Sequence, residues 1–141
     1  MSDSDIADAL FEHLNTLNLS PALPIAWPGR SFNPPTSGAW LRVSFLPGQT
    51  TAFAVGHEDS EDHRGLLQVS VFAPADAGQF VALGLADRIR AHFRRGTRLD
   101  TEDGIAVRVS SPPYLSPPID EPNWVQVAVS VPYLAFAPNT A

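Results

Sequence analysis

The sequence contains no cysteine and no lysine, and none of its apolar runs is long. The absence of cysteine excludes disulfide bonds, thiolate metal sites and cysteine nucleophiles. The first apolar run, residues 6–10, is short and is interrupted by Asp8, which does not fit a secretory signal peptide. No stretch approaches the roughly 18 apolar residues of a membrane-spanning helix. We therefore expect no membrane partner.

The chain is acidic and rich in proline. Its 15 acidic residues outnumber its 9 basic residues, all of them arginine, and the formal net charge is −6. A net acidic chain is a poor general binder of nucleic acid. Hydrophobic residues make up 44% of the sequence, which argues against disorder. Proline, at 14 of 141 residues, is about twice as frequent as its usual ~5%. These values indicate one globular domain over residues 1–141.

Hydrophobic periodicity predicts two helices and four strands. Apolar residues at helical spacing predict a helix over about 4–17, and a second stripe predicts one over about 76–94, with Asp76 as its N-cap and Gly96 as its stop. Four segments alternate apolar and polar residues with the period of half-buried strands: 40–45, 67–71, 105–109 and 125–133. Pro132 cannot donate a ladder hydrogen bond, so the last strand is expected to lie at an edge there or to be nearly finished.

The order of these elements is α-β-β-α-β-β. Two amphipathic helices can cover one face of a four-stranded sheet. We therefore expect an α+β, two-layer fold in which a mixed, mostly antiparallel four-stranded sheet carries both helices on one face.

Three connections stand out by length or composition. Residues 20–38 contain five prolines and are expected to form an extended arm without regular structure, pinned by Trp27 and Phe32. Residues 47–64 form either a long loop or a β-ribbon. Residues 110–122 contain five prolines and predict a rigid loop. Long connections in a small domain are often functional.

An acidic stretch lies in the second of these connections. Its members are His57, Glu58, Asp59, Glu61, Asp62 and His63. Carboxylate and imidazole groups at this density suit a divalent cation, although the pattern is not an EF-hand. A solvated acidic tip and pairing with a basic surface of another subunit are the alternatives.

A basic stretch covers the C-terminal end of the second predicted helix and the residues after it. Five of the nine arginines lie there: Arg88, Arg90, Arg94, Arg95 and Arg98. Some of them complement the helix dipole and pair with Asp87. Nucleic acid and a carboxylate-bearing partner are the other candidates, although no recognised nucleic-acid-binding motif accompanies the group.

The outward face of the predicted sheet carries aromatic residues. Trp40, Phe72 and Trp124 occupy positions that alternate with the apolar core positions. Aromatic residues are enriched in protein interfaces. Either the proline-rich arm or a partner subunit is expected to cover them.

Catalytic motifs are absent from the sequence. It contains no G-x-S-x-G, H-E-x-x-H, P-loop or G-x-G-x-x-G pattern. His13 and His92 lie in the predicted helices and are interpreted as helix-face residues. We therefore expect no enzyme and no organic cofactor.

Several short phrases, in their order, resemble one known family. They are the acidic first helix, residues 24–28 (PIAWP), 32–35 (FNPP), 40–43 (WLRV), 65–71 (GLLQVSV) and 95–97 (RGT), and the stretch from Trp124 to Tyr133. The chain is similar over nearly its whole length to the tail terminator-like proteins of tailed phages and prophages, small minor tail proteins related to tail protein U of long-tailed phages.

The resemblance implies a fold and a role. It implies a hexameric ring that caps the tail tube, stops tail polymerisation and offers the surface that joins the head. The implied partners are the tail tube protein and a head-completion or connector protein, with DNA only passing through the ring. The implied place is the virion, at the head–tail junction, after assembly in the host cytoplasm. It implies no catalysis.

Ring closure requires two different, complementary patches on each subunit. We therefore predict a subunit interface from the charged stretches and the outward tryptophans. The predicted residues are Glu58, Asp59, Glu61, Asp62, Arg88, Arg90, Arg94, Arg95, Arg98, Trp40 and Trp124. The alternatives are a head–tail connector of the same kind of particle, a tail element of a gene-transfer or secretion system, and a small metal-binding enzyme around His57 and His63.

Overall fold

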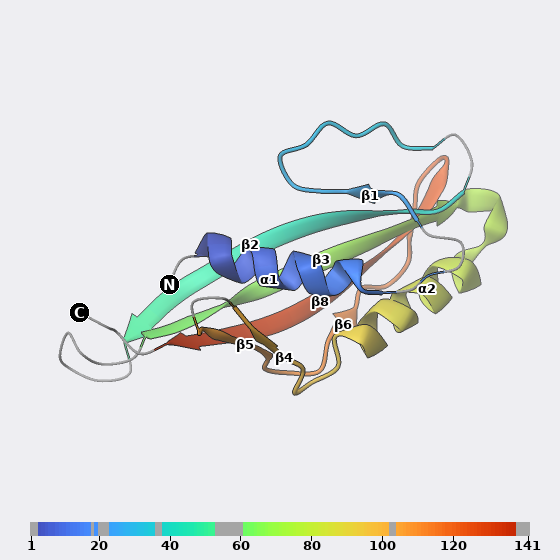
Figure 1. Cartoon of the computed structure of the whole chain (residues 1–141). Coiled ribbons are helices and arrows are strands. Elements are labelled where there is room, and N and C mark those ends of the chain that lie inside the picture. Colours follow the sequence, from blue (N-terminus) through green and yellow to red (C-terminus); the bar gives the residue numbers. More distant parts are fainter. Residues whose placement is uncertain are drawn as a thin grey trace.

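The computed structural model describes residues 3–17, 19, 23–35, 38–52, 61–101 and 104–137, with the backbone alone for 49–52, 61, 62 and 137. The fold is α+β, with two α-helices and a curled mixed sheet (Figure 1). The helices are α1 (Asp3–Asn15) and α2 (Gln79–His92), and the short 3-10 helix η1 (Ala75–Ala77) precedes α2. The class is as predicted, and the number of strands differs.

Three long strands form the body of the sheet, and five short ones extend it. The long strands are β2 (Trp40–Ala52), β3 (Glu61–Pro74) and β8 (Trp124–Ala137). The short strands are β1 (Ile25–Ala26), β4 (Arg98–Asp100), β5 (Ala106–Val109), β6 (Tyr114–Leu115) and β7 (Ile119–Asp120). The order is β1-β2-β3-β8-β5-β4, and β6 and β7 also pair with β8. All pairs are antiparallel except β1–β2.

The prediction of four strands was wrong because four further short segments, β1, β4, β6 and β7, also pair into the sheet. One edge of β8 pairs with β3 over its whole length, while its other edge meets β7, β6 and β5 in succession. Two of these short strands come from the connection 110–122, which was predicted to be a loop. The arm likewise supplies the two-residue strand β1 to the edge of β2. Strands of two residues carry no periodicity that a sequence could reveal.

Of the two alternatives predicted at Pro132, the end of the strand was wrong, whereas a local edge fits the gap in strand pairing on one side of this residue. Pro132 lies within β8, opposite Leu66 of β3. Its carbonyl oxygen accepts a hydrogen bond from Ser110, on the side away from β3. In a strand the N–H and C=O of one residue point to the same side, so the missing donor of Pro132 faces the interval between β5 and β6. The pairing with β3 is therefore unaffected.

The connection 47–64 continues the sheet as a β-ribbon at both of its described ends, and residues 53–60 lie outside the described residues. The register of β2 and β3 shifts between Pro47 and Thr50. A Cβ atom on Gly65 would lie 2.5 Å from the carbonyl oxygen of Leu46 and 2.6 Å from the Tyr133 hydroxyl. A side chain at this position would therefore clash with residues of both neighbouring strands.

Both helices pack on the same face of the sheet, as predicted (Figure 1). They bury one apolar stripe each against the inward side chains of β2, β3, β5 and β8: Ile6, Leu10, Leu14, Ala82, Ala86 and Ile89. This single core holds the sheet and leaves its other face outward. Apolar burial at roughly 25 cal/mol per Å² is the main stabilising contribution of such a core.

The ends of α2 differ from the prediction. Gly78, with φ 84°, is the N-cap, while Asp76 lies in η1 and makes no cap hydrogen bond. The C-cap is Phe93, and Gly96, with φ 90°, lies in the turn that follows. Both glycines occupy backbone conformations that other residues rarely adopt, which is why the chain turns at these positions.

Candidate assembly surfaces

An aromatic cluster lies on the outward face of the sheet, where the arm crosses it. The ring of Trp40 stacks on Phe72 at 4.1 Å between centroids, and Phe32 of the arm stacks on Trp40 at 5.2 Å. Trp124 meets Trp40 edge-on at 6.0 Å. Only 7% of Trp40 and 4% of Phe72 remain exposed. Of the two covers that the sequence left open, the chain's own arm covers these rings.

The arm also holds the other face of the sheet edge. Trp27 packs on Phe11 of α1 at 5.3 Å, on the core side. Between these two anchors, β1 pairs with β2, and the Leu41 N–H donates to the Pro24 carbonyl at 2.9 Å. The described part of the arm therefore packs along the edge of β2 and makes contacts on both faces of the sheet.

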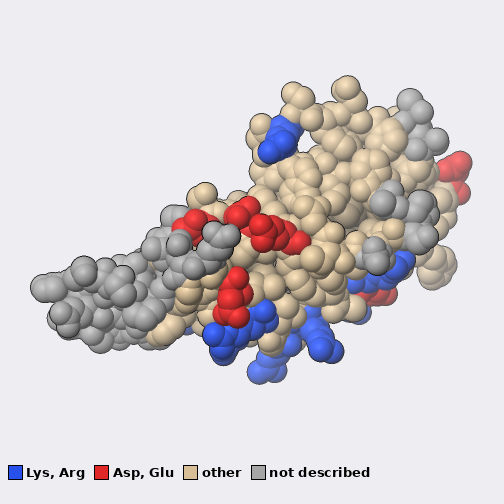
Figure 2. All heavy atoms as spheres, in the orientation of Figure 1, with Lys and Arg blue, Asp and Glu red and all other residues tan. Residues whose placement is uncertain are grey.

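The predicted basic residues spread over three consecutive elements. Arg88 and Arg90 lie on α2, Arg94 and Arg95 in the turn after it, and Arg98 in β4; all five are exposed. Arg90 pairs with Asp87 at 2.9 Å and Arg98 with Asp100 at 3.1 Å. Figure 2 views the molecule from the side that carries α1, and arginines lie along its lower border, below the acidic residues that gather over α1. Exposed ion pairs of this kind contribute little to the free energy of folding, so the stability of the subunit does not explain why these arginines are present.

The predicted acidic stretch is only partly described. His57, Glu58 and Asp59 lie outside the described residues, and for Glu61 and Asp62 only the backbone, at the start of β3, is described. His63 differs from the prediction because it is buried beneath α1, with Nδ1 3.6 Å from Asp3 Oδ1. Among the described residues, no three His, Asp or Glu side chains come together as metal ligands.

His13 and His92 contact each other and connect the C-terminal ends of α1 and α2. Their rings stack at 4.1 Å, and the Nε2 of each lies within hydrogen-bond distance of the other's carbonyl oxygen, at 2.9 Å for His13 and 2.7 Å for His92. The Thr16 hydroxyl donates to the His13 carbonyl. Burial lowers the pKa of His13; the bond to His92 opposes this shift and the charge of His92 adds to it. These rings therefore join the helices.

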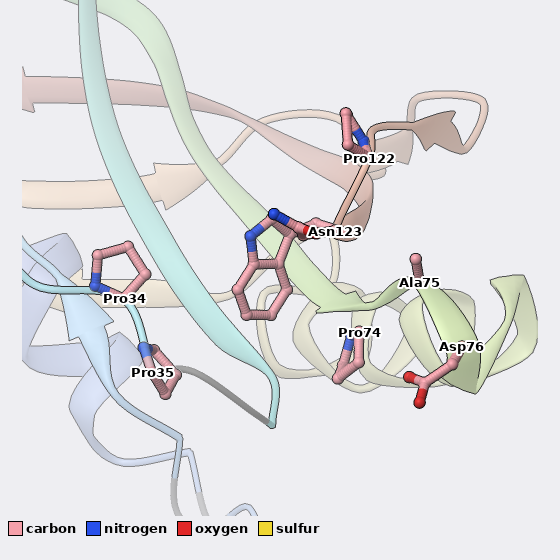
Figure 3. Close-up of a pocket in the computed structure, with 8 residues that line it drawn as sticks. Pro34, Pro35, Pro74, Ala75, Asp76, Pro122 and Asn123 are labelled. Atoms are coloured by element: carbon pink, nitrogen blue, oxygen red, sulfur yellow. The ribbon is translucent and has the colours of Figure 1, made fainter.

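A groove opens at the end of the sheet beside the arm (Figure 3). Its lining consists of Pro34, Pro35, Pro74, Ala75, Asp76, Pro122, Asn123 and Trp124. The lining contains one carboxylate and no nucleophile paired with a base. It therefore suits contact with another polypeptide better than chemistry on a small molecule.

Three surface features were missed in the sequence. Phe80, at the start of α2, is 89% exposed, and it stands outside the apolar stripe that predicted the helix. Asp8 and Glu12 lie exposed one turn apart on α1, a spacing that the sequence does show. The third feature is the pair Arg98 and Arg108, which lie directly opposite each other on β4 and β5. No sequence signal could have found that pair, because it depends on the register.

A hollow surrounds the two arginines on the outward face of the sheet. Ala106, Leu134 and Phe136 complete its lining. Phe136 is 41% exposed. In the part of the chain that the structure describes, Arg108 has no carboxylate at ion-pair distance. The hollow thus combines positive charge with an apolar floor.

Comparison with known proteins gives a consistent result. A family model described as phage tail terminator protein matches residues 5–133. A solved structure with 29% sequence identity superposes with a TM-score of 0.78, and the match covers 96% of each chain. The search of curated proteins finds no match. No helix within the described ranges is long and apolar enough to span a membrane.

Proposed function

The chain belongs to the phage tail terminator family, and we propose that it forms a ring that caps the tail tube, stops tail polymerisation and presents the surface that joins the head. The family is structural, so the chain is a structural protein of a phage tail. The observation that carries the proposal is the family match over residues 5–133, on a chain whose surface features suit protein contact.

The proposed assembly is a hexamer at the head–tail junction of the virion. A ring needs a heterologous contact, in which one patch meets a different patch of the neighbouring subunit. The exposed arginines at the end of α2 provide one sign of charge, and the acidic stretch 57–62 provides the other. Such pairs mainly set register and specificity, while buried aromatic contacts supply affinity. Trp124 fits the second role because it lines the groove, and Trp40 supports it from beneath.

The function is tested on tail tubes assembled without a terminator. Added chain is expected to stop elongation and to appear as one ring at one end of each tube in electron micrographs. Binding to portal-containing heads with no effect on tubes would contradict the proposal and assign the chain to the connector instead. Native mass spectrometry of the purified chain, with and without magnesium, measures the ring size and tests whether a cation takes part.

The charge pairing within the ring is tested separately. Arg90→Glu with Arg94→Glu is expected to weaken assembly, and Glu58→Arg with Asp59→Arg in the same chain is expected to restore part of it. Unchanged sedimentation of the first variant would exclude this pairing while leaving the terminator function open.

A further inference from the structure

Two surfaces on opposite sides of the molecule each place like charges together. On α1, the outward residues Asp8 and Glu12 are separated by one helical turn, where like charges destabilise a helix by a few tenths of a kcal/mol. On the outward face of the sheet, Arg98 and Arg108 lie directly opposite on neighbouring strands, which is also destabilising. Neither arrangement is explained by the folding of one chain.

The two surfaces have opposite signs and matching spacings. Side chains at i and i+4 of a helix are about 5–6 Å apart at Cβ. Directly opposed residues of an antiparallel pair are about 4.5–5.5 Å apart at Cβ. A helix carrying Asp8 and Glu12 can therefore present one carboxylate to each guanidinium of the arginine pair.

We propose that α1 of one subunit docks on the Arg98–Arg108 hollow of a second copy of the chain. The helices cover one face of the sheet (Figure 1), and the residues that line the hollow lie on the other, so the contact is heterologous and can repeat around a ring. Leu134 and Phe136 form an apolar floor that reduces the exposure of the charges to solvent, which strengthens their attraction. This inference rests on the self-assembly in the proposed function and names the surfaces that meet.

A second copy fits the hollow better than nucleic acid does. Asp100 lies 3.1 Å from Arg98 and offsets part of its positive charge, so the hollow suits one or two carboxylates better than the many charges of a polyphosphate. The two carboxylates of a docked α1 can be bound by the two arginines alone.

The test uses two charge-reversed variants. One is Asp8→Arg with Glu12→Arg, and the other is Arg98→Glu with Arg108→Glu. Each is expected to raise the apparent dissociation constant for self-assembly at least about tenfold, because each opposes two like-charged surfaces. In an equal mixture, the two variants can alternate around a ring with an even number of subunits, and every contact is then complementary. We expect the mixture to assemble close to the wild-type level in native mass spectrometry and sedimentation.

Matched variants control for net charge and for folding. Asp120→Arg with Glu121→Arg changes the net charge by as much as the α1 variant does, at exposed residues of the β7–β8 turn, and is expected to leave assembly unchanged. The neutral variants Asp8→Asn with Glu12→Gln and Arg98→Gln with Arg108→Gln are expected to assemble more weakly than wild type and more strongly than the reversed chains. Circular dichroism melts of all variants show whether the subunit is folded.

Four results would overturn the inference. Folded reversed variants that assemble like wild type would exclude these surfaces and leave the ring itself standing. A mixture that stays unassembled while each variant is folded would exclude their direct pairing. Loss of duplex DNA binding in Arg98→Glu with Arg108→Glu, with assembly unchanged, would assign the arginines to nucleic acid. A strictly monomeric wild-type chain would contradict both the inference and the ring.

Discussion

The outward face of the sheet is closed at one end and open at the other. At the closed end, Phe32 of the arm stacks on Trp40, and the Trp40 and Phe72 side chains are nearly inaccessible to water. At the open end, Phe136 and two arginines face solvent. The chain thus covers one part of this face with its own residues and leaves another uncovered. Interactions at the closed end should therefore contribute most to the stability of the subunit, whereas those at the open end should contribute to its association and little to its stability.

The largest expected effect is at the closed end. Trp40→Ala removes a buried indole that contacts three other aromatic rings, and we expect a loss of about 3–5 kcal/mol in the free energy of unfolding. Urea titration followed by far-ultraviolet circular dichroism measures this loss. A loss below about 1 kcal/mol would show that the cluster is not a rigid part of the subunit.

Removing the cover alone should have a smaller effect. Phe32→Ala leaves the sheet intact and exposes one side of Trp40, and we expect a loss of about 1–2 kcal/mol. Tryptophan emission should shift to longer wavelength in the folded state. Pro28→Ala, at an exposed position of the same arm, is the control and should change neither quantity. An unshifted emission in Phe32→Ala would mean that other residues cover Trp40.

The contact between His13 and His92 at the helix ends should depend on pH, because the His13 side chain titrates. The pKa of His13 lies below the ordinary 6.5, so the unfolded chain binds more protons than the folded one as the pH falls through this range. The stability contributed by neutral His13 is therefore present above about pH 6.5 and is lost as the pH falls through the lowered value. We expect the melting temperature to fall on acidification by less in His13→Gln than in wild type. Parallel pH profiles would contradict this role.

The smallest effect on stability is expected at the open end. Phe136→Ser should lower the free energy of unfolding by about 1 kcal/mol, because 41% of its surface is already exposed to water. Self-assembly should nevertheless weaken in the same variant. If Phe136→Ser strongly destabilised the subunit and left assembly unchanged, the open end would contribute to stability and not to association, which contradicts the comparison.

The sequence predicted those parts of the fold that periodicity encodes. Alternation over 67–71 and 125–133 placed the correct side chains in the core, and the helical stripes placed both helices on one face. The two-residue strands could not be predicted, because their pairing depends on what the neighbouring long strand leaves unsatisfied. The caps of α2 were missed for a similar reason: Gly78 and Asp76 are both plausible caps, and only the backbone angles distinguish them.

The candidate site was less predictable than the fold. The basic stretch and the outward tryptophans were visible, since composition alone reveals them. The contact between Trp40 and the arm could be found only once the path of the chain was known. Likewise, the register of β4 and β5 was needed to find that Arg98 lies opposite Arg108. The role assigned to residues 57–62 stays a prediction.

The two unlike edges of β8 have a consequence for amide hydrogen exchange. Ala128 bonds to Ser116 of the segment that bears β6, and the Trp124 and Pro132 carbonyls accept from Glu121 and Ser110, so even-numbered residues of β8 point toward the short strands. Odd-numbered residues point toward β3. Protection from deuterium should therefore alternate from residue to residue along this one strand, with slow exchange at odd positions, where opening requires the long β3–β8 pairing to separate, and faster exchange at even positions.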